Sequence, residues 1–232
     1  MEEIERKRLE VERDKKWRVL GRRAAVFEWM PFVEVAMVAG SMAMGTARIE
    51  SDFDLILGMK TRRIFTGRFF LTMILAGMGW RKRRNSQTTH NRFCLNHFVT
   101  AELYCLRPPY NVYWEELYRR LVPVYGKREE INKFLAANRW ARAGEFRDDG
   151  RWRGGKRRWL KRATERVMGG RFGNWLERRL GIWQLKRIAQ SAAEDMGYKP
   201  RMHYDWTELE FHPDTRRIEE WLKQEGYIYQ NK

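Results

Sequence analysis

The sequence is poor in the residues and runs that mark several large classes of protein. Two cysteines, Cys94 and Cys105, are too few for a disulfide framework, and the four scattered histidines form no zinc-binding pattern. No run approaches the roughly 18 uninterrupted apolar residues of a membrane span. Residues 1–16 are highly charged, whereas a signal peptide requires an apolar core. These absences predict a cytoplasmic protein without a transmembrane segment, whose two thiols pack as small apolar side chains.

The chain does contain enough apolar residues for a folded core, together with a large excess of positive charge. Of its 232 residues 43% are hydrophobic, which excludes wholesale disorder. The formal net charge is +17, and +11 of it falls between Arg151 and Arg187, where 13 lysines and arginines accompany two acids. Such clustering suits RNA, DNA or a polyphosphate, because contacts to phosphates release counterions. A cationic surface that only confers solubility is an equally good interpretation.

Hydrophobic periodicity, proline and glycine divide the chain into an α/β part and a helical part. Residues 2–30 carry the i, i+4 charge pairs of an exposed helix, which Pro31 ends. Short apolar runs predict strands, and the 3.6-residue period predicts helices. The expected strands are 32–39, 53–57, 92–99 and 102–106. The expected helices after the first are 41–47, 112–121, 127–140, 156–168, 172–193 and 215–224. A further helix is expected after Thr61, which could cap it, with apolar residues from Ile64 to Ile74 that run toward Gly77 and Gly79.

We therefore expect three regions along the chain: an N-terminal helix (1–30), an α/β domain (31–109) and a helical, basic C-terminal region (110–232).

Two aspartates at the start of the second expected strand form the main candidate site. Asp52 and Asp54 stand two residues apart, so on a strand both carboxylates point to one face, with Cα atoms roughly 6.5 Å apart. Carboxylate oxygens suit Mg²⁺, and two such ions can clamp the attacking and leaving oxygens of a phosphoryl transfer. Apolar neighbours pack the opposite face of the strand. The pair is therefore predicted to be a metal site rather than part of a polar surface strand.

The first expected strand runs into Gly40 and Ser41, which open a short helix. A small residue there allows a phosphate to approach the backbone at a helix N-terminus. Gly-Ser followed, ten residues later, by Asp-x-Asp within apolar flanks resembles the signature of the DNA polymerase β nucleotidyltransferase superfamily. Weaker similarity to uncharacterised bacterial and archaeal nucleotidyltransferase-domain proteins covers residues 121–125, 138–140, 183–188 and 209–213.

The resemblance implies an α/β fold with a mixed β-sheet flanked by helices, bound Mg²⁺ or Mn²⁺, and an NTP as substrate. It implies transfer of a nucleoside monophosphate to an acceptor that it does not identify, with Gly40 and Ser41 binding the nucleotide. Active members place a third carboxylate on a later strand, yet residues 92–99 contain no acid. Asn96 stands nearest the expected position, and Glu102 could reach in from the next strand. A catalytically degenerate module that binds nucleotide or nucleic acid is the alternative.

The histidines are weaker candidates. Cys94 and His97 are three residues apart, which on a regular strand places them on opposite faces and disfavours a shared metal. We expect both to pack or to line the site. His203 and His212 are expected to be surface or capping groups.

The basic region provides the candidate nucleic-acid contacts, which we place at Arg157, Arg158, Lys161 and Arg162. Eleven tryptophans are many for this length, and aromatic rings among cations can stack on nucleic-acid bases. The favoured interpretation is that these rings form the helical core, because Trp159, Ala163 and Val167 recur at i, i+4. A membrane-surface helix over residues 156–168 is a third possibility, since such helices look alike in sequence.

Overall fold

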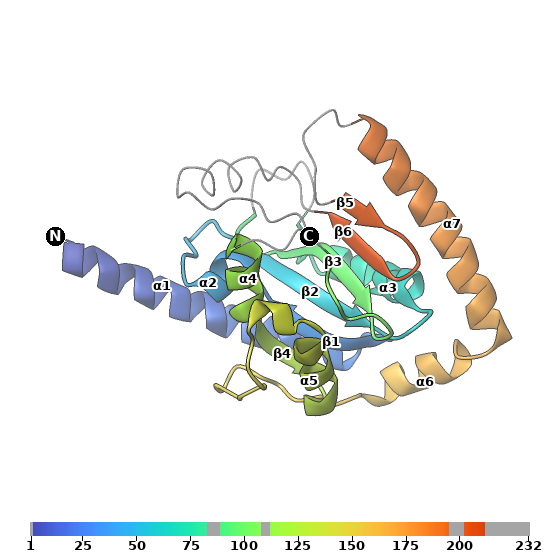
Figure 1. Ribbon diagram of the computed structural model, residues 1–232, viewed down its shortest axis with the longest axis horizontal. Coiled ribbons are helices and arrows are strands. Elements are labelled where there is room, and N and C mark those ends of the chain that lie inside the picture. Colours follow the sequence, from blue (N-terminus) through green and yellow to red (C-terminus); the bar gives the residue numbers. More distant parts are fainter. Residues whose placement is uncertain (1, 83–88, 108–111, 195–201, 212–232) are drawn as a thin grey trace.

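The computed structural model describes residues 2–82, 89–107, 112–194 and 202–211 (Figure 1). Its strands are β1 (Val33–Val38), β2 (Phe53–Met59), β3 (Phe93–Thr100), β4 (Val122–Gly126), β5 (Met202–Tyr204) and β6 (Glu208–Phe211). Its helices are α1 (Glu2–Arg23), η1 (Ala24–Glu28), α2 (Gly40–Met44), α3 (Ile64–Gly77), α4 (Val112–Arg119), α5 (Arg128–Ala137), η2 (Arg139–Ala141), α6 (Trp159–Val167) and α7 (Arg171–Glu194).

All six strands form one mixed sheet in the order β4-β1-β2-β3-β6-β5. The only parallel pair among these strands is β2 with β3, and the other neighbours are antiparallel. The C-terminal end of β1 therefore lies beside the N-terminal ends of β2 and β3. Any side chains that follow β1 or precede β2 and β3 meet at this end of the sheet.

Each face of the sheet has its own hydrophobic cluster. On one face, Leu57 and Phe98 pack with residues of α1, α3 and α7. On the other face, Ile56 and Val99 pack with residues of α4 and α5. Strands β1 to β4 are largely buried on both faces, and their alternating side chains divide between the two clusters, whereas β5 at the edge is only partly buried.

The inner side of α7 joins the fold through polar contacts. The Glu177 carboxylate accepts hydrogen bonds from the backbone N–H groups of Phe65 at 2.9 Å and Thr66 at 2.8 Å. These donors lie in the first turn of α3, where no helical acceptor is available to them. A carboxylate is also favoured by the partial positive charge of that helix terminus. The contact is a cap supplied by a distant helix.

The general class expected from the sequence is confirmed, because the structure is an α/β protein with a mixed sheet flanked by helices. The secondary structure expected for two segments was wrong. Residues after 110, expected to be helical throughout, also contribute β4, β5 and β6, because strands of three to five residues are too short to show a period. Residues 102–106 form a turn and irregular chain instead of a strand. The helix expected at 215–224 lies outside the described residues.

Candidate functional site

Asp52 and Asp54 meet where β1 ends and β2 begins. Their carboxylates and the Cys94 thiol each offer a ligand atom, and these atoms lie within 4.8 Å of one another. Asp54 pairs with Cys94 across the parallel β2 and β3 strands, which turns both side chains to the same face. The expectation that the two aspartates share a face is confirmed. Two carboxylates this close form a local negative centre that favours a bound cation.

Gly40 lies directly against this acidic pair. Its φ of +60° belongs to the left-handed region, which glycine occupies without steric cost. A Cβ atom at this position would lie only 2.1 Å from Asp54 Oδ2. The adjacent Ala39 N–H donates a hydrogen bond of 2.9 Å to the Asp54 carbonyl oxygen. A residue without a side chain is therefore needed here for the position of Asp54 as well as for the turn into α2, which Gly40 and Ser41 open.

Two lysines that the sequence analysis did not single out organise the site. Lys82 Nζ lies 2.6 Å from Asp52 Oδ2 in a partly buried ion pair. Lys16, almost fully buried on α1, donates to the carbonyl oxygens of Ile49 at 2.9 Å and Ser51 at 2.7 Å. These bonds fix the loop that leads to Asp52. Both lysines are distant from the aspartates in sequence, so no local pattern marks them.

The electrostatics of the pair follow from burial and mutual repulsion. Burial, and then the charge of Asp52, raise the pKa of Asp54 to about 6, while Lys82 and the Cys94 thiol act in the opposite direction. The same two causes, burial and the neighbouring carboxylates, raise the pKa of Cys94, so its thiol stays protonated at neutral pH. A cation between the carboxylates would relieve the repulsion that raises the Asp54 pKa.

Asn96 was expected to stand nearest the position of the missing third carboxylate, and Glu102 to be the acid that could reach in, but the register of β3 places Cys94 beside Asp54. Asp54 pairs with Cys94 but Ile56 pairs with His97, so β3 has one extra residue between these pairs. Asn96 falls within this bulge, and Cys94 takes the place beside Asp54. Glu102 is exposed in the turn after β3, at the opposite end of that strand.

The same bulge corrects the expectation that Cys94 and His97 lie on opposite faces, because their partners Asp54 and Ile56 share one face of β2. The two residues still belong to separate clusters. His97 Nε2 lies 2.9 Å from Glu208 Oε1, and both pack with Glu210 in a buried group whose ligand atoms lie within 4.8 Å of one another.

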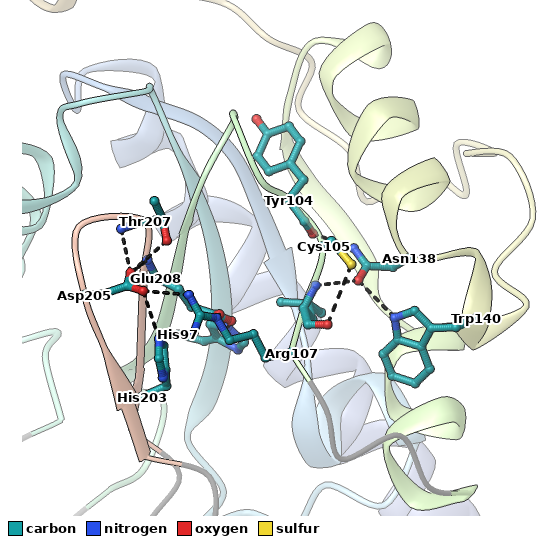
Figure 2. A network of polar contacts seen from close by, with 11 residues as sticks. His97, Tyr104, Cys105, Arg107, Asn138, Trp140, His203, Asp205, Thr207 and Glu208 are labelled. Carbon is teal, nitrogen blue, oxygen red and sulfur yellow. Dashed lines mark hydrogen bonds and ion pairs between the residues drawn. The ribbon is translucent and has the colours of Figure 1, made fainter. Parts of the chain in front are cut away.

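Figure 2 shows the contacts that link Glu208 of this buried group to the partly exposed Arg107, Asp205 and His203. Arg107 reaches Glu208 Oε2 at 3.0 Å and Asp205 Oδ2 at 2.6 Å, and His203 Nε2 lies 3.0 Å from Asp205 Oδ2. Burial alone would raise the pKa of Asp205, but hydrogen bonds from His203 and Thr207 outweigh it and lower the pKa. The contact with Arg107 makes this network a link between the β5-β6 hairpin and the chain after β3. His203 is thus a partly exposed pairing group, and His212 lies outside the described residues.

The second group of residues in Figure 2 surrounds the Asn138 side chain, which anchors the segment that follows β3. Its Oδ1 accepts from Leu106 N at 2.9 Å, and its Nδ2 donates to the Tyr104 carbonyl oxygen at 2.7 Å. Trp140 Nε1 donates to the same Oδ1 at 3.3 Å. These bonds give Asn138 and Trp140 a structural role.

The expected nucleic-acid contacts at the start of α6 are largely internal. Lys161 is buried, and its Nζ donates to the Val33 carbonyl oxygen at 2.5 Å and to Tyr125 Oη at 2.9 Å. Arg157 pairs with the buried Glu165. Arg158 Nε pairs with Glu28 Oε2 at 2.8 Å. Of the four predicted contact residues only Arg162 is exposed.

Comparison with known proteins adds no family to this description. Searches of protein-family models, of curated proteins and of solved structures each find no match to the chain. Within the described residues, no helix is long and apolar enough to cross a membrane.

Proposed function

We propose that the chain is an Mg²⁺-dependent nucleotidyltransferase that transfers a nucleoside monophosphate from an NTP to an acceptor hydroxyl. The observation that carries the proposal is the acidic pair Asp52 and Asp54, which lies against the left-handed Gly40 at the end of β1. The order strand, Gly-Ser turn, helix, acidic strand is that of the superfamily that the sequence resembles.

The donor set fits a hard divalent cation. Two carboxylates offer the oxygen ligands that Mg²⁺ and Mn²⁺ accept, and their close approach leaves excess negative charge. Bound divalent ions would supply charge stabilisation for the attacking and leaving oxygens. Lys82 would balance part of the charge on Asp52 and could move to a phosphate of the nucleotide, because both are anionic partners for its ammonium group.

In the proposed reaction the acceptor oxygen attacks the α-phosphorus of the NTP. The bond from that phosphorus to the bridging oxygen breaks, pyrophosphate leaves with the electron pair, and the acceptor hydroxyl releases its proton. Among the described residues, the group that lies around Asp54 contains no third carboxylate to take this proton. The protonated Cys94 thiol is not a base. This observation favours a second candidate function, a module that binds nucleotide without turning it over.

Thermal stability tests the metal and nucleotide site. Mg²⁺ with an NTP should raise the melting temperature, because a ligand that binds only the folded state at 100 times its Kd stabilises it by about 2.7 kcal/mol. The double variant Asp52→Asn, Asp54→Asn should lose this shift. The matched control is Asp148→Asn, Asp149→Asn, which changes two exposed aspartates elsewhere and should keep it. An undiminished shift in the first variant would refute the site.

Activity separates the two candidate functions. The wild-type chain is incubated with each α-labelled NTP, Mg²⁺ or Mn²⁺, and total cellular RNA and protein. Label transferred by the wild type and not by the Asp52, Asp54 variant supports the transferase. A melting-temperature shift with no transferred label supports the binding module.

A further inference from the structure

Helices α6 and α7 run along the outer edge of the molecule, with α7 beside α3 and the β5-β6 hairpin (Figure 1). The side chains that these two helices bury include charged and polar groups, namely Lys161, Glu165, Glu177 and Gln184. Their exposed side chains include several large apolar ones. We name this surface the α6–α7 outer face and define it by Trp159, Leu160, Val167, Phe172, Trp175, Ile182 and Trp183.

The exposure of these residues is unusual for a folded chain. Trp159 is 65% exposed, Trp175 is 54% exposed and Ile182 is 55% exposed. The helical spacing of Trp159, Ala163 and Val167 favoured a core role for this stripe, and that expectation was wrong, because all three residues are exposed. Single exposed apolar residues are ordinary, but a run of them along two consecutive helices is typical of a surface that binds a partner.

The charge of the outer face is of one sign. Seven lysines and arginines on α6 and α7 are exposed, and none has an ion-pair partner among the residues that the structure describes. They are Arg162, Arg166, Arg171, Arg178, Arg179, Lys186 and Arg187. Between residues 159 and 192 the two acids, Glu165 and Glu177, are both buried in internal contacts. The partner of this surface is therefore expected to be anionic.

We propose that the α6–α7 outer face binds the surface of a lipid bilayer that contains anionic lipids. Tryptophan and phenylalanine side chains suit the headgroup region, and aliphatic side chains gain by entering the acyl boundary. Arginines that stack on these rings, Arg179 over Trp175 at 5.8 Å and Arg187 over Trp183 at 5.7 Å, are placed to contact lipid phosphates from the same depth.

The composition favours this partner over two others. A nucleic acid would use the cations and the rings, but Leu160, Val167 and Ile182 offer nothing to a phosphate or a base stack. A second copy of the chain that docked by the same face would oppose seven unpaired cations with seven more, which disfavours association. An anionic bilayer offers contacts to all three classes of side chain: the aliphatic ones, the aromatic ones and the cationic ones.

Co-sedimentation of the full chain with vesicles tests the proposal. We expect binding to phosphatidylcholine vesicles that contain phosphatidylserine, and weaker binding to phosphatidylcholine alone. The variant Trp175→Gln, Ile182→Gln, Trp183→Gln should lower the partition coefficient at least about tenfold, because it removes the apolar contacts and keeps the charges. Glutamine preserves helix propensity, and exposed positions keep the fold, which circular dichroism checks.

A second variant and a matched control assign the effect to this face. Arg178→Gln, Arg179→Gln, Lys186→Gln should weaken binding to the anionic vesicles about 100-fold and reduce their advantage over neutral ones. The control replaces three exposed apolar residues of α1, Ile4, Leu9 and Val11, by glutamine and should bind as the wild type does. Brominated acyl chains should quench the wild-type tryptophan fluorescence and quench the first variant less.

Several results would overturn the proposal. These are no binding of the wild type to anionic vesicles, equal binding by the first variant, or equal loss of binding in the α1 control. Binding of single-stranded RNA without binding of vesicles would assign the surface to nucleic acid instead. Self-association that the first variant abolishes, with no vesicle binding, would assign it to a second copy of the chain.

Discussion

The buried Lys161 predicts how the stability of the protein depends on pH. Burial, the largest cause, lowers the pKa of Lys161 from 10.5 to about 7; the Glu34 charge opposes this shift and the Arg157 charge adds to it. In the unfolded chain the lysine holds its proton up to its ordinary pKa. Between these two pKa values the unfolded state therefore binds more protons than the folded state, and the free energy of unfolding rises with pH.

The magnitude follows from the two pKa values. Below pH 7 both states are protonated and Lys161 adds no slope. Above it the slope approaches about 1.4 kcal/mol per pH unit, so the free energy of unfolding should rise by about 2 kcal/mol between pH 7 and pH 9. The variant Lys161→Met has no proton to lose and should lack this rise. Urea denaturation of both proteins at several pH values measures the difference.

The control for this experiment is Lys156→Met, which removes an exposed lysine just before α6 and should keep the wild-type slope. At pH 7 the Lys161→Met variant loses two hydrogen bonds, to Val33 and Tyr125, and also loses the cost of a buried charge. Its stability at one pH therefore decides nothing. Parallel pH profiles for wild type and Lys161→Met would show the reasoning to be wrong.

Three further changes have expected outcomes. Gly40→Ala should displace Asp54 and cost about 1–2 kcal/mol from the left-handed backbone alone, seen as a lower melting temperature and a smaller Mg²⁺-NTP shift; an unchanged shift would contradict the contact. Glu177→Ala should cost about 2–3 kcal/mol by leaving two N–H groups of α3 without their acceptor, as urea denaturation would measure; a loss below the error of the method would refute the cap. Cys94 should resist a thiol reagent in the folded protein near pH 8 and react after unfolding, because burial raises its pKa; rapid labelling of native Cys94 would disprove this.

The parts of the site that could be predicted from sequence are those that local geometry determines. Asp52 and Asp54 share a face because the period of a strand is two, and Gly40 ends an apolar run where only a turn fits. The sequence left open whether Cys94 packs or lines the site, and it did not indicate Lys82, because the positions of both residues depend on strand pairing. The register of β3 contains a bulge that leaves no mark in the sequence.

The orientation of α6 could not be predicted for a different reason. Hydrophobic periodicity assumes that the apolar stripe of a helix faces the core, and Trp159, Ala163 and Val167 form such a stripe. The structure buries the Lys161 and Glu165 side instead, where Val33, Tyr125 and Phe32 supply hydrogen-bond partners. Phe32 and Val33 lie more than a hundred positions before their partners on α6, and Tyr125 lies on β4, 36 positions before Lys161. Periodicity within the helix therefore cannot indicate these contacts.

The place of β6 in the sheet has a consequence for the growing chain on the ribosome. The first three strands are available once residue 100 has been synthesised, but the outer edge of β3 is covered only after residue 208. Until then β3 exposes backbone hydrogen-bonding groups that another chain could pair with. Nascent chains that stall or terminate between these points are therefore expected to aggregate, and their survival would depend on chaperones that shield this edge during translation.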